Sequence, residues 1–259
     1  RSEYFVYECD EFDKNFLHFQ PFLSIVTNIE HDHPDTYPTE DSYFQAFGEF
    51  IAQSKQAIMW QDDASSLSDL DMGTVTATTE ISPMLRLPGE HNRKNATLIL
   101  KALEVFKLPA KYAADGLNKF PGTHRRFESL GANLYSDYGH TPMEIKATLQ
   151  MAKELSDKVV LVYQPHQNRR QFHIRDEYTN EIFTNADKVL WLPTYLSRED
   201  ESQAILTPKD LTSNLAASKV DIVSMDDDLY ARIESLRSDG NLVLCMGAGD
   251  IDSWVRSNL

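Results

Sequence analysis

The chain of 259 residues has few cations, few cysteines and no long apolar segment. Its 25 lysine and arginine residues are outnumbered by 40 aspartate and glutamate residues, so the formal net charge is −15. A surface of this sign repels nucleic-acid phosphates and anionic lipid, which excludes both as partners of the bulk surface. It leaves room for a local basic pocket that binds a small phosphate ligand. We expect neither a membrane-spanning helix nor a signal peptide.

The chain has only two cysteines, Cys9 and Cys245, and each lies in an apolar run typical of a buried strand end. This usage predicts a reducing compartment, and we expect a cytoplasmic protein. The length and the hydrophobic content of 41% suit one large domain or two medium ones. Because the chain begins with Arg1, we expect a processed or fragmentary chain.

Apolar residues recur at strand and helix spacings in the first half of the chain. This spacing predicts strands at 3–8, 24–29 and 57–60 and helices at 40–57 and 91–106. Residues 62–80 are polar and β-branched, which favours loops and short hairpin strands. In the second helix, Ile99, Leu103 and Phe106 are expected to share the buried face.

The second half alternates strands with helices more regularly. Strands are predicted at 132–138, 158–164, 188–193 and 241–247, and helices at 141–155 and 226–238. Thr141, Pro142 and Glu144 suit the capped start of a helix. The apolar runs of the strands are continuous, which predicts an α/β fold with a mostly parallel sheet covered on both faces. A Pro-Gly turn near residues 120–123 predicts a domain boundary, with domains at 1–121 and 122–259.

Polar side chains follow nearly every predicted strand, at the edge where parallel sheets bind ligands. They are Glu8, Asp10, Glu11, Glu30, His31, Asp32, His33, Asp137, His140, His166, Arg169 and Arg170, with the glycine-rich turn Gly247, Ala248 and Gly249 after the last strand. Core packing alone does not require this pattern, so it indicates a binding site.

Each of these signals also has a purely structural interpretation. His31 and His33 suit surface histidines, and Glu8 suits an exposed carboxylate at a strand end. Residues 124–128 suit a solvated charged run. The segment at 247–252 is a weak dinucleotide motif, because Asp252 stands where glycine or alanine is needed, and a strand-to-helix turn is the better interpretation. A zinc site at the two histidines lacks a third ligand at a familiar spacing, and the surrounding carboxylates favour a hard cation.

The order of these segments resembles the Mur ligases of bacterial cell-wall synthesis. The matching segments are ECDEFDKNFL, VTNIEHDHPDTY, LPGEHNRKNA, GTHRRFE, SDYGHTPMEI and YQPHQNRR, followed by VLCMGAGDI. The resemblance is greatest to the members that join L-alanine to UDP-N-acetylmuramate. It implies that ATP phosphorylates the muramyl carboxylate to an acyl phosphate, and that the amine of L-alanine then displaces phosphate. It also implies part of a P-loop-type central ATPase domain, followed by a Rossmann-like domain that binds the amino acid.

The resemblance implies a role for each matching residue. Glu8 and His33 match metal-binding positions for Mg²⁺, whereas His31 matches a variable position. The implied ATP-binding residues are Asn92, Asn95, Arg126 and Asp137, of which Arg126 reaches the phosphates and Asp137 lies near the ribose. The implied amino-acid site holds Tyr138, His140, His166 and Arg170. Within these sets, His140, His166 and Arg126 are the implied catalytic residues.

The chain also departs from the family pattern. Gln167 stands where some members have arginine, and neither the P-loop nor the UDP-sugar domain is present in these 259 residues. Two interpretations follow. The chain is either a C-terminal fragment of an amide-forming ligase, inactive by itself, or a remnant that serves as a binding or assembly module without catalysis. Because the metal, ATP and amino-acid positions are intact, the ligase is the preferred interpretation.

Overall fold

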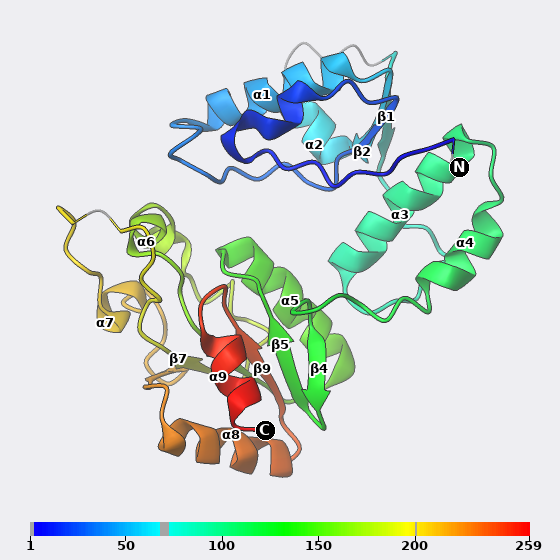
Figure 1. The fold of residues 1–259 in the computed structure, drawn as a ribbon. Coiled ribbons are helices and arrows are strands. Elements are labelled where there is room, and N and C mark those ends of the chain that lie inside the picture. Colours follow the sequence, from blue (N-terminus) through cyan, green and yellow to red (C-terminus); the bar gives the residue numbers. More distant parts are fainter. Residues whose placement is uncertain (1–2, 68–72, 200) are drawn as a thin grey trace. The chain divides into compact units, whose positions relative to one another are not determined.

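The computed structural model describes residues 3–67, 73–199 and 201–259. The chain divides into two compact units (Figure 1). The first comprises Arg1–Leu87 with Asn92–Lys119, and the second comprises Pro88–His91 with Phe120–Leu259. Among the described residues, no helix combines the length and the apolar character that a bilayer crossing requires.

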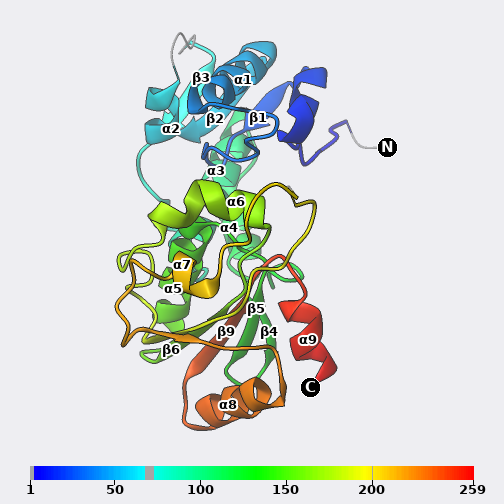
Figure 2. The same cartoon turned by 90° about the vertical axis from the view of Figure 1, so that its left-hand side faces the viewer.

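The first unit contains a three-stranded parallel sheet in the order β1-β2-β3 (Figure 2). Its elements are η1 (Phe12–His18), β1 (Leu23–Ile25), α1 (Glu40–Gln53), β2 (Gln56–Trp60), α2 (Gln61–Ser66), β3 (Val75–Thr78), α3 (Glu90–Val105) and α4 (Ala110–Leu117). The central strand β2 is covered on both faces. Met59 packs with Phe47 of α1, whereas Ile58 packs with Leu98 and Ala102 of α3. This alternation follows from the opposite directions of successive side chains in a strand.

Three predictions for this unit are wrong. Residues 3–8 form no strand, because no neighbouring strand pairs with them among the described residues, and Phe5 and Val6 are 88% and 93% exposed. Cys9 is accordingly only half-buried and lies at no strand end. The region 62–80 holds no hairpin strands in its described part, because β3 pairs with β2 in parallel and helix α2 lies between them in the chain. Residues 68–72 of that region lie outside the described residues.

The buried face of α3 also differs from the expectation. Ile99 is 40% exposed, whereas Leu98 and Leu100 are buried. The cause is α4, which the sequence pattern did not reveal. Leu98 faces β2, and Leu100 packs with Ala114 of α4. Leu103 is partly buried in the same cluster as Leu100, so the expectation is wrong for Ile99 and not for Leu103.

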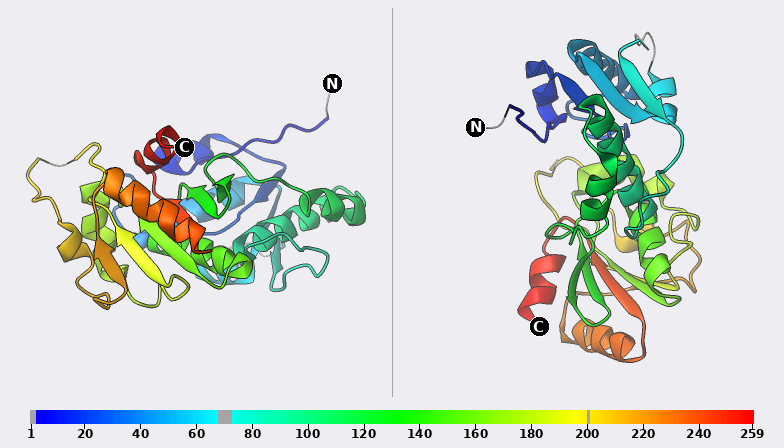
Figure 3. Two further views of the ribbon diagram at one scale, coloured as in Figure 1. Left: turned by 90° about the horizontal axis from the view of Figure 1, so that it is seen from below. Right: turned by 90° about the vertical axis from the view of Figure 1, so that its right-hand side faces the viewer.

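The second unit contains a six-stranded sheet in the order β4-β5-β9-β6-β7-β8. Only the hairpin of β4 with β5 is antiparallel, and β5 and β9 run side by side in parallel (Figure 3). The elements are β4 (Glu128–Gly131), β5 (Leu134–Asp137), α5 (Pro142–Leu155), β6 (Val159–Tyr163), α6 (Asn168–Ile174), η2 (Arg175–Glu177), β7 (Lys188–Trp191), α7 (Pro208–Leu211), β8 (Val220–Ile222), α8 (Asp227–Ser238), β9 (Leu242–Met246) and α9 (Ile251–Ser257). The predicted α/β class with mostly parallel sheets is confirmed.

The two faces of this sheet bury different side chains of the same strands. Leu161 of β6 packs with Leu149 of α5, whereas Val162 packs with Ile233 of α8 and Val255 of α9. Helices therefore cover both faces, and α9 follows β9 onto the face opposite α5. The order of the strands reverses around β9, and such a reversal opens a crevice at the carboxyl ends of the strands.

Because the second unit has its own core, it should survive digestion of the first. Trypsin should cleave after Lys119, which is exposed and lies at the division between the units. Mass spectrometry should then detect a stable piece beginning at Phe120. The variant Lys119→Gln should delay its appearance. Rapid loss of the second half, with the first half persisting, would contradict this expectation.

Candidate active site

Three strand ends of the second unit meet around two histidine rings. His140 follows β5 and His166 follows β6, and their ring centroids are 5.7 Å apart. Tyr195, which follows β7, stacks on His166 with a centroid distance of 5.7 Å and an interplanar angle of 9°. The main chain fixes this stack, because Gln167 N donates to Tyr195 O at 2.9 Å and Tyr195 N donates to Pro165 O at 2.8 Å. Tyr195 is not among the residues predicted from the sequence, because an aromatic residue in a loop carries no distinctive spacing.

Glu144 holds the turn that carries His140. Its carboxylate accepts hydrogen bonds from the amides of His140 and Thr141 at 2.8 and 3.0 Å, and with Thr141 it forms the predicted capping box of α5. Its oxygens also lie 3.5 Å from His140 Nδ1 and 3.7 Å from a guanidinium nitrogen of Arg126. The sequence revealed the cap but not these further contacts, because they depend on how the turn folds back.

Burial and neighbouring charges set the protonation of this site. Burial raises the pKa of Glu144, but the charge of His140 and the amides of His140 and Thr141 outweigh it, so its pKa lies below the usual value. Burial is also the main cause that lowers the pKa of His166 to about 4, with smaller contributions from His140 and Arg170. The Arg125 charge acts in the same direction and the Glu199 carboxylate acts against it. His166 is therefore neutral at pH 7.

The hydrogen bonds assign a tautomer to each ring. Arg170 Nη1 lies 3.4 Å from His166 Nδ1, and since a guanidinium only donates, Nδ1 accepts and the proton of neutral His166 lies on Nε2. His140 Nδ1 faces two acceptors, Tyr138 O at 3.2 Å and the Glu144 carboxylate. Its Nδ1 therefore carries a proton, and Nε2 of neutral His140 is an acceptor. The two rings thus offer opposite groups, a donor on His166 and an acceptor on His140.

The two neighbouring arginines differ in their surroundings. The Tyr138 ring lies 4.8 Å from the Arg125 guanidinium and 5.3 Å from that of Arg126. Arg125 is 22% exposed and donates to Gly247 O at 2.8 Å, so it ties the start of the unit to the turn after β9. Arg126 is 55% exposed and forms an ion pair with Glu144. Its guanidinium is therefore more open to solvent than that of Arg125.

Asp137 is the predicted ribose contact, and the structure shows it in a structural role. It is only 5% exposed, and its two oxygens accept from the amides of Gly139 and Phe127, each at 2.8 Å. Burial raises its pKa, although the two amides oppose the shift. The carboxylate thereby anchors the turns on both sides of β5. A nucleotide contact by Asp137 stays a prediction.

The remaining nucleotide residues lie in the first unit. Asn92 and Asn95 are on α3, and because they are three residues apart they share a face of that helix. Asn95 is exposed. Arg126 and Asp137, in contrast, lie in the second unit, so the predicted ATP-binding residues are divided between the two units.

The predicted metal-binding residues Glu8 and His33 both lie in the first unit. His33 Nε2 lies 3.4 Å from Glu11 Oε1 and 3.9 Å from Asp32 Oδ2, and its hydrogen bond lowers the pKa of Glu11. Glu8 is exposed. Across residues 3–67, 73–199 and 201–259, no group of three histidine, cysteine, aspartate or glutamate side chains is placed to hold a metal ion. Mg²⁺ is commonly held by one or two protein side chains together with substrate phosphates and water. Metal binding by Glu8 and His33 therefore stays a prediction.

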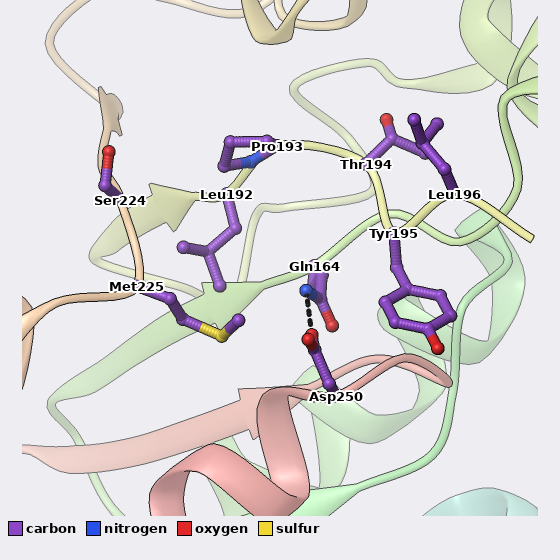
Figure 4. A pocket seen from close by; sticks show the side chains of 9 residues that line it. All are labelled: Gln164, Leu192, Pro193, Thr194, Tyr195, Leu196, Ser224, Met225 and Asp250. Carbon is purple, nitrogen blue, oxygen red and sulfur yellow. Dashed lines mark hydrogen bonds between the residues drawn. The ribbon is translucent and has the colours of Figure 1, made fainter.

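A cavity of about 300 Å³ lies at the carboxyl ends of β6, β7 and β8 (Figure 4). Gln164 Nε2 donates to Asp250 Oδ1 at 2.6 Å on one side of it, and Tyr195 connects it to the His166 stack. The glycine-rich segment beside it is a strand-to-helix turn leading into α9, as predicted. Gly247 is required there by close approach, because a Cβ atom would lie 2.6 Å from Gln164 O.

Comparisons with known proteins identify relatives of both units. Two family models match the chain: the Mur ligase middle domain over residues 1–82, and the Mur ligase glutamate ligase domain over residues 125–249. Curated relatives named UDP-N-acetylmuramate–L-alanine ligase include those of Lactobacillus gasseri, at 31% identity, and Clostridium acetobutylicum, at 30%. The alignments cover 98% and 97% of this chain but 64% and 63% of the relatives. The chain thus spans less than two thirds of their length.

Solved structures show the same fold. UDP-N-acetylmuramate–alanine ligase MurC of Thermotoga maritima matches with a TM-score of 0.64 at 22% identity, over 93% of this chain and 59% of that one. MurF of Acinetobacter baumannii matches with a TM-score of 0.68 at 15% identity, over 95% and 61%. These likenesses show a fold of the α/β class. The chain belongs to the Mur ligase family and carries its middle and C-terminal domains.

Replacing Glu144 by glutamine should lower the free energy of unfolding by about 1 kcal/mol at pH 7, because a neutral side chain loses the charge that faces His140, Arg126 and two main-chain amides. The folded-state pKa of Glu144 is lowered, so its contribution is present above the unfolded pKa and is lost as pH falls through the folded value. Urea unfolding at pH 7 and at about pH 3 should therefore show a difference that shrinks with acid. Glu201→Gln, in an exposed loop, is the matched control. A difference independent of pH would contradict the assignment.

His166 should destabilise the chain in mild acid. Its folded-state pKa of about 4 is below the unfolded value of 6.5, so between these values the unfolded state binds a proton that the folded state does not. The free energy of unfolding should therefore decrease as pH falls through this window. For the variant His166→Gln, this free energy should decrease less over the same window. NMR titration of labelled histidine gives the pKa directly. The same dependence of the free energy of unfolding on pH in the unsubstituted protein and in His166→Gln would contradict this prediction.

Proposed function

We propose that this chain is part of an ATP-dependent ligase that joins L-alanine to UDP-N-acetylmuramate in peptidoglycan precursor synthesis, a cytoplasmic reaction. The observation that carries the proposal is the cluster of His140, His166 and Arg170 at the strand ends of the unit that matches the ligase domain. The substrate names come from the curated relatives, which are called UDP-N-acetylmuramate–L-alanine ligase.

The proposed reaction has two steps. ATP first phosphorylates the muramyl carboxylate, which converts a poor leaving group into phosphate. The amine of L-alanine then attacks the acyl phosphate, an amide bond forms, and phosphate leaves with the bonding electrons. The exposed guanidinium of Arg126 is suited to the phosphate charge, because its planar donors match phosphate oxygens.

The residues of the second unit suit the amino acid in this scheme. The Arg170 guanidinium would bind the carboxylate of L-alanine, and the Nε2–H group of His166 would donate to the same group or to an oxygen of the acyl phosphate. His140 Nε2 would accept a proton from the attacking amine, while the Glu144 carboxylate near Nδ1 stabilises the imidazolium that forms. Tyr138 would line this site beside the two arginines.

The proposal is tested on the longest reading frame that contains these 259 residues. Purified protein should release phosphate only when ATP, UDP-N-acetylmuramate and L-alanine are all present, and mass spectrometry should detect the amide product. A product formed with a different amino acid would overturn the substrate assignment. A folded protein that binds L-alanine but forms no amide would support the non-catalytic remnant instead.

Arg170→Ala should raise the Michaelis constant for L-alanine at least tenfold, a loss of about 1.4 kcal/mol. The lost contact is one that the substrate carboxylate keeps throughout the reaction. The constants for ATP and the UDP sugar should change little. Arg169→Ala is the matched control, because Arg169 lies on the same helix with an exposed side chain. If the constant for ATP rose instead, Arg170 would belong to the nucleotide site.

A further inference from the structure

A buried chain of hydrogen bonds connects the turn that carries His140 with the turn that carries His166. Tyr163 Oη donates to His140 O at 2.9 Å and lies 3.0 Å from Tyr178 Oη. Tyr178 Oη donates to Gln171 Oε1 at 2.8 Å, and Gln171 Nε2 donates to His166 O at 3.0 Å. This hydrogen-bonded network therefore begins at the main-chain carbonyl of His140 and ends at that of His166.

We infer that Tyr163, Tyr178 and Gln171 are positioning residues that set the separation of the His140 and His166 rings, and thereby the geometry of the amino-acid site. This inference rests on the proposed function for its catalytic meaning. Its structural content, the coupling of the two turns, does not depend on which substrate is used.

The need for such a link follows from the topology. His140 follows β5 and His166 follows β6, and β9 lies between these strands. Neighbouring strands are about 4.8 Å apart, so the two turns start roughly 9.6 Å from each other, too far for a direct main-chain hydrogen bond. The main chain of β9 connects the strand ends themselves, and a direct link between the two turns beyond them requires side chains that reach from one turn to the other.

The three side chains are rigidly held. Tyr163, Tyr178 and Gln171 are each 0% exposed. Both tyrosine rings pack edge-on against Trp191, each at a centroid distance of 5.0 Å. Because the rings cannot shift, the positions of their hydroxyl groups are fixed, and the carbonyls that these groups bind are fixed with them.

Packing alone does not require the hydroxyl groups. Phenylalanine would fill the same volume, and a buried hydroxyl is unfavourable unless it is hydrogen-bonded. Gln171 Oε1 only accepts, so the Tyr178 proton is used there, and the single Tyr163 proton is divided between His140 O and Tyr178 Oη. Removal of the Tyr163 hydroxyl should therefore release the His140 turn, whereas removal of the Tyr178 hydroxyl should break the link between Tyr163 and Gln171 and so uncouple the two turns.

The first test uses the 259-residue chain and does not need activity. Tyr163→Phe and Gln171→Met keep the volume and remove hydrogen bonds. Both should raise the pKa of His166 from about 4 toward its ordinary value, by about 0.5 or more, because a looser turn exposes the ring and separates it from His140 and Arg170. NMR titration of labelled histidine measures the change. Tyr135→Phe is the control, since Tyr135 packs on the same core outside the network.

A purely structural role predicts a different result. The variants would then melt at lower temperature while the His166 titration stayed where it is, and the inference would be overturned. If one variant fails to fold, the other, or Tyr178→Phe, provides the same comparison.

The second test uses the longest reading frame with the assay for L-alanine. Tyr163→Phe should raise the Michaelis constant for L-alanine about fivefold and leave that for ATP unchanged. If the histidine titration moves but the unmodified protein makes no alanine-dependent product, the network stands and the proposed function fails. If the product forms and neither measurement responds to the variants, the network has no positioning role.

Discussion

The geometry of the second unit depends on where its last strand is inserted. β9 pairs with β5 on one side and β6 on the other, although it is the last strand along the chain. This placement buries every residue of β6 and β9. It also reverses the strand order at the centre of the sheet, so that the turns carrying His140 and His166 open on one edge with the glycine-rich turn between them. The close approach of that turn to Gln164, which only glycine permits, is the local cost of this insertion.

The site concentrates positive groups on a molecule whose net charge is −15. Arg125, Arg126 and Arg170 gather near two histidines, while Glu144 is placed behind His140. Anions that approach such a molecule are repelled by most of its surface, so binding depends on this local set of donors. Net charge is a sum over all residues, so it does not reveal a small basic region of this kind.

The sequence predicted the second unit better than the first for a physical reason. The strands of β6, β7 and β9 are buried on both faces, so their apolar runs are continuous and easily recognised, and the capping box at Thr141 marks α5. Residues 3–8 have the composition of a strand but no neighbour to pair with, which a single segment cannot reveal. The candidate residues that follow strands could be identified from the sequence, because the carboxyl ends of parallel strands lie at one edge of the sheet. The contacts of Glu144 and Tyr195 could not be predicted from the sequence, because they arise from loops that fold back across the sheet.

Each unit contains one cysteine, and the two thiols differ in accessibility. Cys245 lies in β9, is 0% exposed, and has its pKa raised to about 12 by burial. Cys9 is only half-buried, and burial raises its pKa as well. Alkylating reagents require a thiolate that they can reach, so Cys9 is modified while the protein is native and Cys245 only when the sheet around β9 opens. Alkylation of Cys245 therefore reports the opening of the sheet around β9, and the mass of the protein shows whether one thiol or both have reacted.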